Sequence, residues 1–281
     1  MQPLSVVIPT LGGESLRETI EQLNRGTLIP AEILVCIPEE EAFRVENLFI
    51  HNVVVVKTNI RGQVAQRAIG FGFAKHKMVL QLDDDVLLNE GAVQELAEAL
   101  YQLGPGNALA PVYFDAATGR CIHEARSGLS GYLMSLYYYV ACGAPWGLKR
   151  MGVVTTIGLC FGVDSDYCGS KYFETEWLPG GCVLCFREDL IEENYFPFVG
   201  KAYSEDLIHS FLRKSIGIRH WVIPSAECII DAAEPEICPS SILAQLEARR
   251  YCVSLIGGQA WRLSLYEALS RVRRVLTIVK F

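Results

Sequence analysis

Short apolar runs alternate with helix-like segments through the first 115 residues, and this alternation constrains the fold most strongly. The five runs, rich in valine and isoleucine, are residues 4–9, 32–37, 52–57, 77–82 and 108–114. Segments with helical apolar spacing lie between them, at residues 14–24, 39–49, 62–76 and 89–103. Because the runs are almost continuously apolar, they predict strands that are buried on both faces of a parallel sheet covered by helices. The sequence therefore predicts an α/β fold.

Polar residues follow these runs at the positions where such sheets bind ligands. In open α/β sheets the ligand site lies outside the carboxyl ends of the strands. Pro9 and Thr10 end the first run, Glu39 follows the second, and three aspartates follow the fourth at 83–85. We therefore expect these residues to meet at one edge of the sheet.

The aspartate triplet predicts a site for a hard cation. Alternate residues can converge on one ion, so Asp83 and Asp85 are the expected pair. An ion bound by one or two carboxylates, with positions left for substrate phosphates, is typical of Mg²⁺ or Mn²⁺. The alternative is a solvated turn in which Asp85 or Asn89 caps the next helix.

A second pair of carboxylates lies at the start of a predicted helix. Ser204 is a good N-cap residue, and apolar residues at 207, 208, 211 and 212 give the helix one buried face. Glu205 and Asp206 then fall in the first turn, where the helix dipole stabilises negative charge and is expected to lower their pKa values. Acidic residues at a helix start also serve stability alone, and that alternative stays open.

Three segments, in their order, carry a family resemblance. SVVIPT (5–10), NIRGQVAQRAIGFGFAKHKMVLQLDDD (59–85) and YSEDLIHSFLRKSIG (203–217) resemble motifs of the inverting glycosyltransferases of family 2. By motif order the resemblance extends over roughly residues 4–231. It implies the GT-A fold: a mixed, mainly parallel sheet flanked by helices, here with a C-terminal helical extension.

The resemblance also implies a division of the chain. Residues 1–115 would form the half that binds a nucleotide sugar. Residues 116–238 would form the half of the same domain that binds the acceptor and supplies the catalytic base, and 239–281 would form the C-terminal helices.

Individual residues receive implied roles in the same way. The implied donor site comprises Pro9, Thr10, Glu39, Arg67, Asp83, Asp84 and Asp85, with Asp83 and Asp85 holding Mn²⁺ or Mg²⁺. The implied catalytic residues are Asp206, as the base, and Glu205 beside it; the implied acceptor site includes Trp177, Gly180 and Gly181.

The implied reaction is a single displacement on a nucleotide-diphosphate sugar. Asp206 would deprotonate a hydroxyl of a glycan or lipid-linked acceptor, which attacks the anomeric carbon and inverts its configuration, while the metal neutralises the leaving diphosphate. The alternatives are a catalytically silent binding or scaffold protein and a nucleotidyltransferase. The second would normally need a basic phosphate loop near the first strand, and the Gly12-Gly13 segment has no lysine or arginine cluster.

The chain departs from the family pattern at three places. Ala68 follows Arg67 where asparagine is usual, and Cys36 begins the segment where an aspartate-rich turn often contacts the base. No histidine follows residues 222–228 to serve as a further metal ligand. We expect Glu39 to replace the base contact and Glu227 or Asp231 to replace the histidine.

Two arginines carry alternatives of their own. Arg67 either serves the donor site or is an exposed helix residue paired with Gln63 one turn earlier. Arg213 shares a helical stripe with Asp206 and Ser210, so it either orients Asp206 or contacts phosphate, or else makes a surface ion pair of little energy. His209 is expected to be a neighbour of the site and not a metal ligand.

The net charge and the cysteine content limit the expected ligands and the expected cellular compartment. A net charge of −7 excludes a general nucleic-acid binder, which needs a basic face. The ten scattered cysteines and a start without a signal-like core predict free thiols in a reducing, cytoplasmic compartment. Cys182 and Cys185 lie in a predicted strand, where their spacing sends the side chains to opposite faces, so buried thiols are expected there and not a zinc site.

Two segments suggest contact with a membrane. Residues 128–148 carry no charge, which predicts either a buried acceptor subdomain or an apolar surface that touches lipid. The C-terminal segment predicts a basic amphipathic helix that either docks on the inner face of a membrane or packs on the core with its arginines outward. Its apolar stripe is Trp261, Leu265, Leu269, Val272, Leu276 and Val279, flanked by Arg262, Arg271, Arg273, Arg274 and Lys280.

Overall fold

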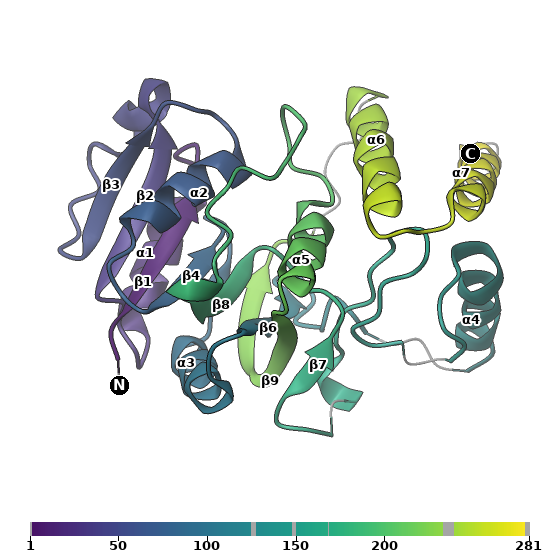
Figure 1. Cartoon of the computed structure of the whole chain (residues 1–281), viewed down its shortest axis with the longest axis horizontal. Helices are drawn as coiled ribbons and strands as arrows, with labels where there is room; N and C mark the ends of the chain where they lie inside the picture. The colour runs from purple at the N-terminus through teal and green to yellow at the C-terminus, as the bar shows by residue number, and fades with distance from the viewer. Residues whose placement is uncertain (1, 125–127, 148–149, 168, 233–238, 279–281) are drawn as a thin grey trace.

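A nine-stranded mixed sheet runs through the protein, in the order β3-β2-β1-β4-β8-β6-β9-β5, with β7 paired to β9 (Figure 1). This computed structural model describes residues 2–124, 128–147, 150–167, 169–232 and 239–278. The strands are β1 (Leu4–Pro9), β2 (Glu32–Pro38), β3 (Val53–Thr58), β4 (Met78–Leu82), β5 (Leu87–Leu88), β6 (Asn107–Asp115), β7 (Phe173–Thr175), β8 (Cys182–Phe186) and β9 (Arg219–Ile230). The α-helices are α1 (Ser15–Arg25), α2 (Gln63–Phe73), α3 (Ala92–Leu103), α4 (Gly128–Cys142), α5 (Glu205–Ser215), α6 (Pro239–Leu255) and α7 (Ala260–Ile278). The 3₁₀ helices are η1 (Glu39–Val45), η2 (Ser165–Tyr167) and η3 (Arg187–Asp189).

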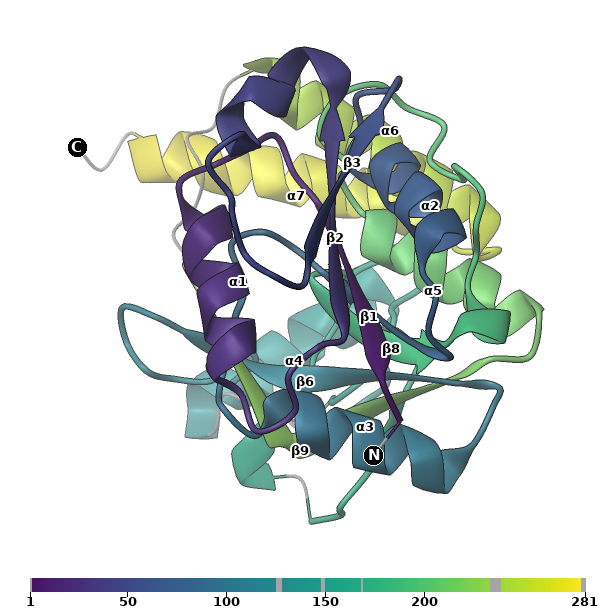
Figure 2. The ribbon, with the colours of Figure 1, turned by 90° about the vertical axis from the view of Figure 1, so that its left-hand side faces the viewer.

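Helices cover both faces of β1, β2 and β4, whose residues are all buried. Because side chains alternate along a strand, Val6 and Ile8 of β1 face the cluster that includes α1 and α3, while Val7 faces the cluster that includes Phe71 of α2. Figure 2 shows α1 and α2 on opposite sides of β1 to β3. The predicted α/β architecture is confirmed, and each of the five predicted strands is found within one residue of its expected ends.

Two local expectations were wrong in this half. Residues 39–45 form the 3₁₀ helix η1 in place of an α-helix, and its two buried residues, Ala42 and Val45, stand three apart, the period of a 3₁₀ turn. Strand β3 is not buried on both faces, since Val54 is 45% and Val55 is 38% exposed. It is the edge strand of the sheet, so no neighbouring strand covers its outer side.

Strand β8 makes the sheet mixed and thereby shapes the ligand-binding edge. It lies antiparallel between β4 and β6, with Cys182 opposite Leu82. The residues just before β8 therefore meet the residues just after β4, and the Asp83 amide donates to the Gly181 carbonyl at 2.8 Å. The triple aspartate and the glycine pair thus lie side by side, although almost a hundred residues separate them in the chain.

The cysteines behave mainly as small core residues. Cys182 packs in the cluster of α1 and α3, and Cys185 packs in a different cluster with Ala108 and Val183, so the predicted opposite facing is confirmed. The eight cysteines within the described residues are free thiols. Cys168 and Cys238 lie outside the described residues.

Helices α4 and α7 pack against each other at the end of the molecule away from β3 (Figure 1). Their shared core includes Ala141, Cys142 and Leu263. Helix α4 is buried on one side, at Gly131, Ser135, Ala141 and Cys142, and exposed on the other, so it is only partly enclosed by the protein. None of the helices in the described parts of the chain has the length and apolar character needed to span a bilayer.

Helix α7 packs on the protein, but its orientation differs from the predicted one, in which the apolar stripe would face the core and the arginines would face outward. The side of α7 that faces the protein carries Leu263 and Glu267, while Trp261, Leu265 and Leu269 of the predicted apolar stripe are 61%, 39% and 42% exposed. The helix therefore packs on the protein and leaves its apolar stripe toward solvent. Val279 and Lys280 of that prediction lie outside the described residues.

Candidate functional site

The first carboxylate of the triplet is held at the end of β4. One Asp83 oxygen, Oδ1, accepts a hydrogen bond from Gln63 Nε2 at 2.8 Å and another from Arg67 Nη2 at 3.2 Å. Asp84 accepts a hydrogen bond from the Thr10 hydroxyl, which joins the triplet to the end of β1. Asp85 is exposed. The three aspartates therefore have three different environments.

Arg67 joins the two carboxylate motifs. Its side chain is 1% exposed, and Nη1 lies 2.5 Å from Glu205 Oε1 while Nη2 contacts Asp83. The alternative of an exposed arginine paired with Gln63 was wrong, because Gln63 donates to Asp83. Burial alone lowers the pKa of Arg67, but the charges of Glu205 and Asp83 outweigh it and raise the pKa above its ordinary value. These partners offset the cost of removing the guanidinium charge from water.

Glu205 is occupied by hydrogen bonds that hold the site together. Besides Arg67, its Oε1 accepts a hydrogen bond from the Tyr195 hydroxyl. The Tyr195 ring stacks on His209 with 4.8 Å between centroids, and His209 Nδ1 lies 3.8 Å from the same oxygen. Burial lowers the pKa of His209 well below its ordinary value, so the ring is neutral. Sequence patterns gave no signal for Tyr195, which lies in an irregular segment.

Asp206 is the less constrained carboxylate of the pair. Its Oδ1 accepts a hydrogen bond from the Leu207 amide at 2.9 Å. Burial, reinforced by the charge of Glu205, raises the pKa of Asp206 from 3.8 to about 7. The expected lowering by the helix dipole was therefore wrong, because enclosure by the surrounding protein outweighs the dipole.

The start of α5 has an unusual backbone. Ser204 occupies the N-cap position as expected, but its φ of 56° and ψ of 21° are left-handed and its side chain makes no capping bond. Its carbonyl accepts instead from the Ile208 amide at 3.2 Å. A left-handed non-glycine residue is uncommon and costs free energy, and such residues cluster at functional sites. This turn directs Glu205 and Asp206 toward the end of β4.

The glycine pair lies between the two motifs. A Cβ atom at Gly180 would stand 2.8 Å from Glu205 Oε2, and one at Gly181 would stand 3.4 Å from Asp83 Oδ2. Gln81 donates from β4 to the Gly180 carbonyl and fixes the turn. A side chain at position 180 would force the Glu205 carboxylate to shift, and this carboxylate is held by Arg67 and Tyr195 through its other oxygen.

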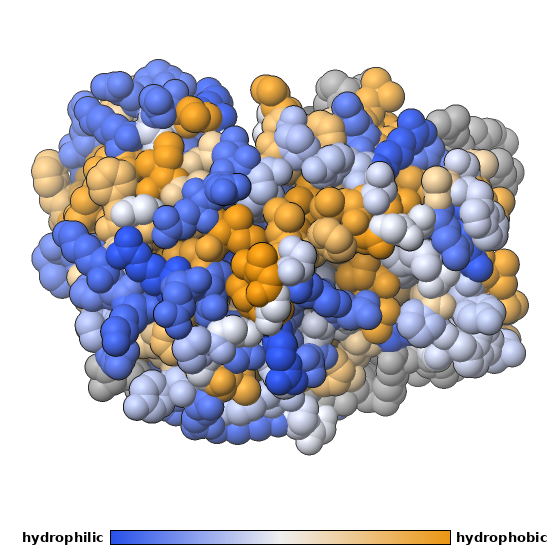
Figure 3. All heavy atoms as spheres, in the orientation of Figure 1, coloured by the Kyte–Doolittle hydropathy of each residue, from blue (hydrophilic) through white to orange (hydrophobic). Residues whose placement is uncertain are grey.

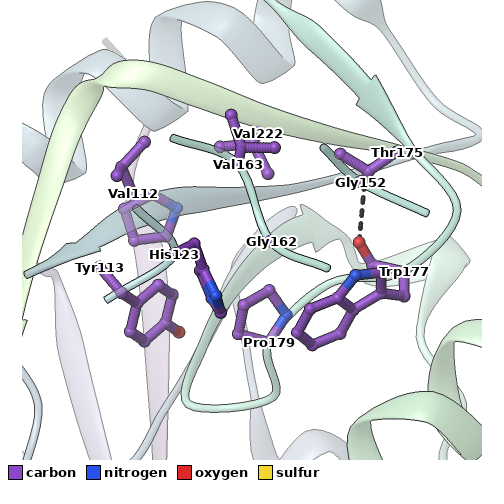
Figure 4. A pocket seen from close by; sticks show the side chains of 11 residues that line it. Val112, Tyr113, His123, Gly152, Gly162, Val163, Thr175, Trp177, Pro179 and Val222 are labelled. Carbon is purple, nitrogen blue, oxygen red and sulfur yellow. Dashed lines mark hydrogen bonds between the residues drawn. The ribbon is translucent and has the colours of Figure 1, made fainter. Parts of the chain in front are cut away.

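Trp177 forms a wall and not an exposed platform. Its indole is 6% exposed, and Nε1 donates to the Phe161 carbonyl at 2.9 Å. Figure 4 shows Trp177 with His123, Tyr113 and Pro179 around a small cavity. The expected acceptor residue therefore shapes the site from behind.

The nucleotide end of the site contains a residue that the sequence did not single out. Gln66 is 2% exposed, and its Nε2 donates to the carbonyls of Thr10 and Cys36 at 2.8 and 2.7 Å, which fixes the ends of β1 and β2. Gln63, Gln66 and Arg67 form one polar stripe on α2, a signal visible in the sequence. Pro9 is the last residue of β1. Glu39 is exposed at the start of η1.

Asp83 and Asp85 are suited to a divalent cation. The hydrogen bonds from Gln63 and Arg67 both go to Oδ1 of Asp83. Burial raises the pKa of Asp83 to about 6; the charge of Arg67 lowers this pKa, and the negative charges of Glu205 and Asp85 raise it. A cation would relieve this repulsion and complete its shell with water and phosphate oxygens. The part of the chain that the structure describes contains no group of three or more His, Cys, Asp or Glu placed to hold a metal. The role of Glu227 or Asp231 as a further ligand stays a prediction.

Arg213 is buried beneath the site. Its side chain is 1% exposed, so the expected surface ion pair was wrong. Nε and Nη2 have no hydrogen-bond partner among the described residues. Ser210, on the same stripe, accepts from the Leu178 amide at 3.0 Å and ties α5 to the segment before the glycine pair.

A cavity of about 270 Å³ lies between α4 and the segment after it. Cys160 lines this cavity and packs against the apolar cluster that includes Leu207 and Ile208 of α5, the helix that begins with Glu205 and Asp206. Arg150 also lines it, with its guanidinium carbon 5.2 Å from the ring centroid of Tyr138 and 5.1 Å from that of Phe161. The cavity is lined by Ile122, His123, Glu124, Gly131, Met134, Tyr138, Arg150, Met151, Cys160, Phe161 and Gly162.

Residues 5–128 match the family model of glycosyl transferase family 2. The match includes Thr10, Arg67 and the triple aspartate but ends before Glu205 and Asp206, whereas the resemblance inferred from motif order extends further. No curated protein sequence matches the chain.

Two solved structures share the GT-A fold of this chain. A crystal structure of GalNAc-T7 with UDP, GalNAc and Mn²⁺ has 16% sequence identity and a TM-score of 0.59, covering 85% of this chain and 46% of that chain. A crystal structure of S. aureus TarS 1-349 has 14% sequence identity and a TM-score of 0.51, covering 89% of this chain and 65% of that chain. This chain thus spans less than two thirds of either neighbour, and the likeness concerns the fold.

Proposed function

We propose that the protein is a metal-dependent, inverting glycosyltransferase that moves a sugar from a nucleotide-diphosphate sugar to an acceptor hydroxyl. The observation that carries the proposal is the buried bridge from Asp83 through Arg67 to Glu205. It joins the end of β4, where Asp83 lies, to the first turn of α5, which also contains Asp206. The family match over residues 5–128 supports the same class of reaction.

The donor binds, in this proposal, between the ends of β1 and β4. Gln66 and Thr10 hold the strand ends in place, so the backbone that faces the nucleotide is rigid before it binds. Asp83 and Asp85 would hold Mn²⁺ or Mg²⁺, which when bound neutralises negative charge on the diphosphate. Because a neighbour of the same fold was crystallised with UDP, GalNAc and Mn²⁺, uridine diphosphate sugars with Mn²⁺ are the first donors to test.

Asp206 is the general base in this proposal. A pKa raised to about 7 leaves the carboxyl able to accept a proton from the acceptor hydroxyl near neutral pH. Glu205 is more constrained than Asp206, because its Oε1 already accepts hydrogen bonds from Arg67 and Tyr195. One available carboxylate supports a single displacement with inversion. The acceptor approaches from the cavity whose wall contains Cys160 and Arg150.

The test is turnover on a panel of nucleotide sugars with Mn²⁺ or Mg²⁺. Asp206→Asn should lower turnover at least about 10²-fold with donor binding retained, as expected for loss of a general base. Asp83→Ala should weaken metal-dependent donor binding. Glu18→Gln, on the exposed side of α1, is the matched control and should leave both unchanged.

Each other outcome supports a different conclusion. Donor binding without turnover for every donor and acceptor would favour a silent binding protein. Release of sugar 1-phosphate with transfer of the nucleoside monophosphate would favour a nucleotidyltransferase. If a sugar is transferred, the anomeric configuration of the product, read by proton NMR, decides the stereochemistry, and a retained configuration would refute the single displacement.

A further inference from the structure

An apolar face at the end of the molecule away from the nucleotide site has no partner within the described chain. Helix α4 exposes Leu129 by 75%, Leu133 by 57% and Val140 by 54%. Leu136 adds 44%, and the whole helix contains no charged residue. Exposed apolar side chains that cluster in this way mark an interaction surface, whereas single ones are ordinary.

Helix α7 extends this face. Trp261, Leu265 and Leu269, four residues apart, are all exposed on one stripe. Arg262 joins the two helices, since its Nη1 donates to the Tyr139 carbonyl at 3.0 Å and also to that of Val140. In Figure 3 orange apolar spheres reach the surface at the edge where Figure 1 shows α4 and α7. We call this surface, formed by the exposed residues of α4 and α7, the α4–α7 face.

Aromatic side chains lie at its rim. Trp146 is 53% exposed and packs edge to face with Tyr132 and Tyr139, at 5.6 Å between centroids in both pairs. Both tyrosines are 50% exposed. Tryptophan and tyrosine prefer the interface between lipid headgroups and hydrocarbon, because each ring has an apolar body and a polar edge.

The charge distribution indicates what kind of surface the face would meet. Residues 239–281 carry seven basic and two acidic residues in a chain whose net charge is −7. The positive charge is therefore concentrated in the segment that contains α7, and the rest of the protein is acidic. An acidic protein with one basic, apolar end is complementary to an anionic lipid surface that attracts that end and repels the other.

We propose that the α4–α7 face docks the protein on the surface of an anionic lipid bilayer. The helices lie on the bilayer without crossing it, with the leucines among the acyl chains and the aromatic rings at headgroup level. The other side of α4, through Gly131, Met134 and Tyr138, lines the cavity that contains Arg150. Docking therefore brings that cavity close to the headgroups, where a lipid-linked acceptor would be presented.

Vesicle flotation of the full chain tests the proposal. The probes are vesicles of phosphatidylcholine alone and of phosphatidylcholine mixed with phosphatidylglycerol. The protein should float with the anionic vesicles, less with the neutral ones, and less at high salt. The double variant Leu133→Ser/Val140→Ser should lower the membrane-bound to free ratio at least about tenfold, because two apolar side chains no longer enter the bilayer.

The control is Phe49→Ser, which changes an 87% exposed apolar residue in the nucleotide half and should leave binding unchanged. Because all these side chains are exposed, thermal midpoints should match that of the unchanged protein. Equal flotation of the double variant, or no flotation of the unchanged protein, would refute the proposal. A second outcome would also refute the proposal: the unchanged protein binds no vesicles and sediments as a dimer, whereas the double variant sediments as a monomer. The face would then join two copies of the protein. Flotation needs neither donor nor acceptor, so its result is independent of whether glycosyl transfer is observed.

Discussion

Replacing Asp206 by asparagine should stabilise the protein at alkaline pH and leave it unchanged at acid pH. The folded protein raises the pKa of this carboxyl from 3.8 to about 7, so the native state binds its proton more tightly than the unfolded chain does. The free energy of unfolding therefore falls as the pH rises from about 4 to 7, and the full loss is present above pH 7. A rise of this size corresponds to about 4 kcal/mol as an upper value. Asparagine cannot ionise and avoids the loss.

Thermal unfolding at two pH values measures this effect. At pH 8 the midpoint of Asp206→Asn should exceed that of the unchanged protein by roughly 5–10 °C. At pH 4, where the native carboxyl is protonated, the two midpoints should agree. Glu18→Gln, which also removes one negative charge but at an exposed position, serves as the control for net charge. Equal midpoints at pH 8 would show that the carboxylate is ionised there without penalty, and the argument that burial poises it as a base would fail.

Three further predictions follow from the same contacts. Arg67→Met should lower the free energy of unfolding by about 3–5 kcal/mol in urea titrations, because it leaves Asp83 and Glu205 with an unpaired buried charge; an unchanged midpoint would contradict the bridge. Gly70→Ala should destabilise by about 1–3 kcal/mol, since its Cβ would stand 2.5 Å from the nearest side-chain atoms, while Gly72→Ala in the same helix meets nothing within 4 Å and should stabilise slightly. Similar effects of the two alanines would show that α2 is not packed as described. Chelation of divalent cations should abolish turnover and Mn²⁺ should restore it, so full turnover in EDTA would exclude the metal role.

Local patterns were sufficient for the elements that carry the site. Apolar runs and helical spacing depend only on neighbouring residues, so they located β1, β2, β4 and α5 and placed the carboxylates at a strand end and a helix start. The opposite facing of Cys182 and Cys185 followed from the two-residue period of a strand. These features were confirmed because the tertiary contacts favour the same local structure as the sequence pattern does.

The partners of each charged residue depended on contacts that no local pattern contains. Arg67 and Glu205 are 138 residues apart, and their pairing required β8 to insert antiparallel beside β4. The direction of the pKa shift at Asp206 was wrong from sequence, because the helix dipole acts within one turn whereas burial is supplied by segments distant in the chain.

The apolar stripe of α7 also separates what the sequence determines from what only the tertiary structure determines. The spacing of its apolar residues correctly predicted an amphipathic helix over the described part of α7. The same spacing is compatible with an apolar stripe that packs on the protein and with one that is exposed to solvent. Only the packing of Leu263 and Glu267 against the protein decided that Trp261, Leu265 and Leu269 point to solvent. Periodicity in the sequence determines that a helix has an apolar side, and the tertiary structure determines what that side meets.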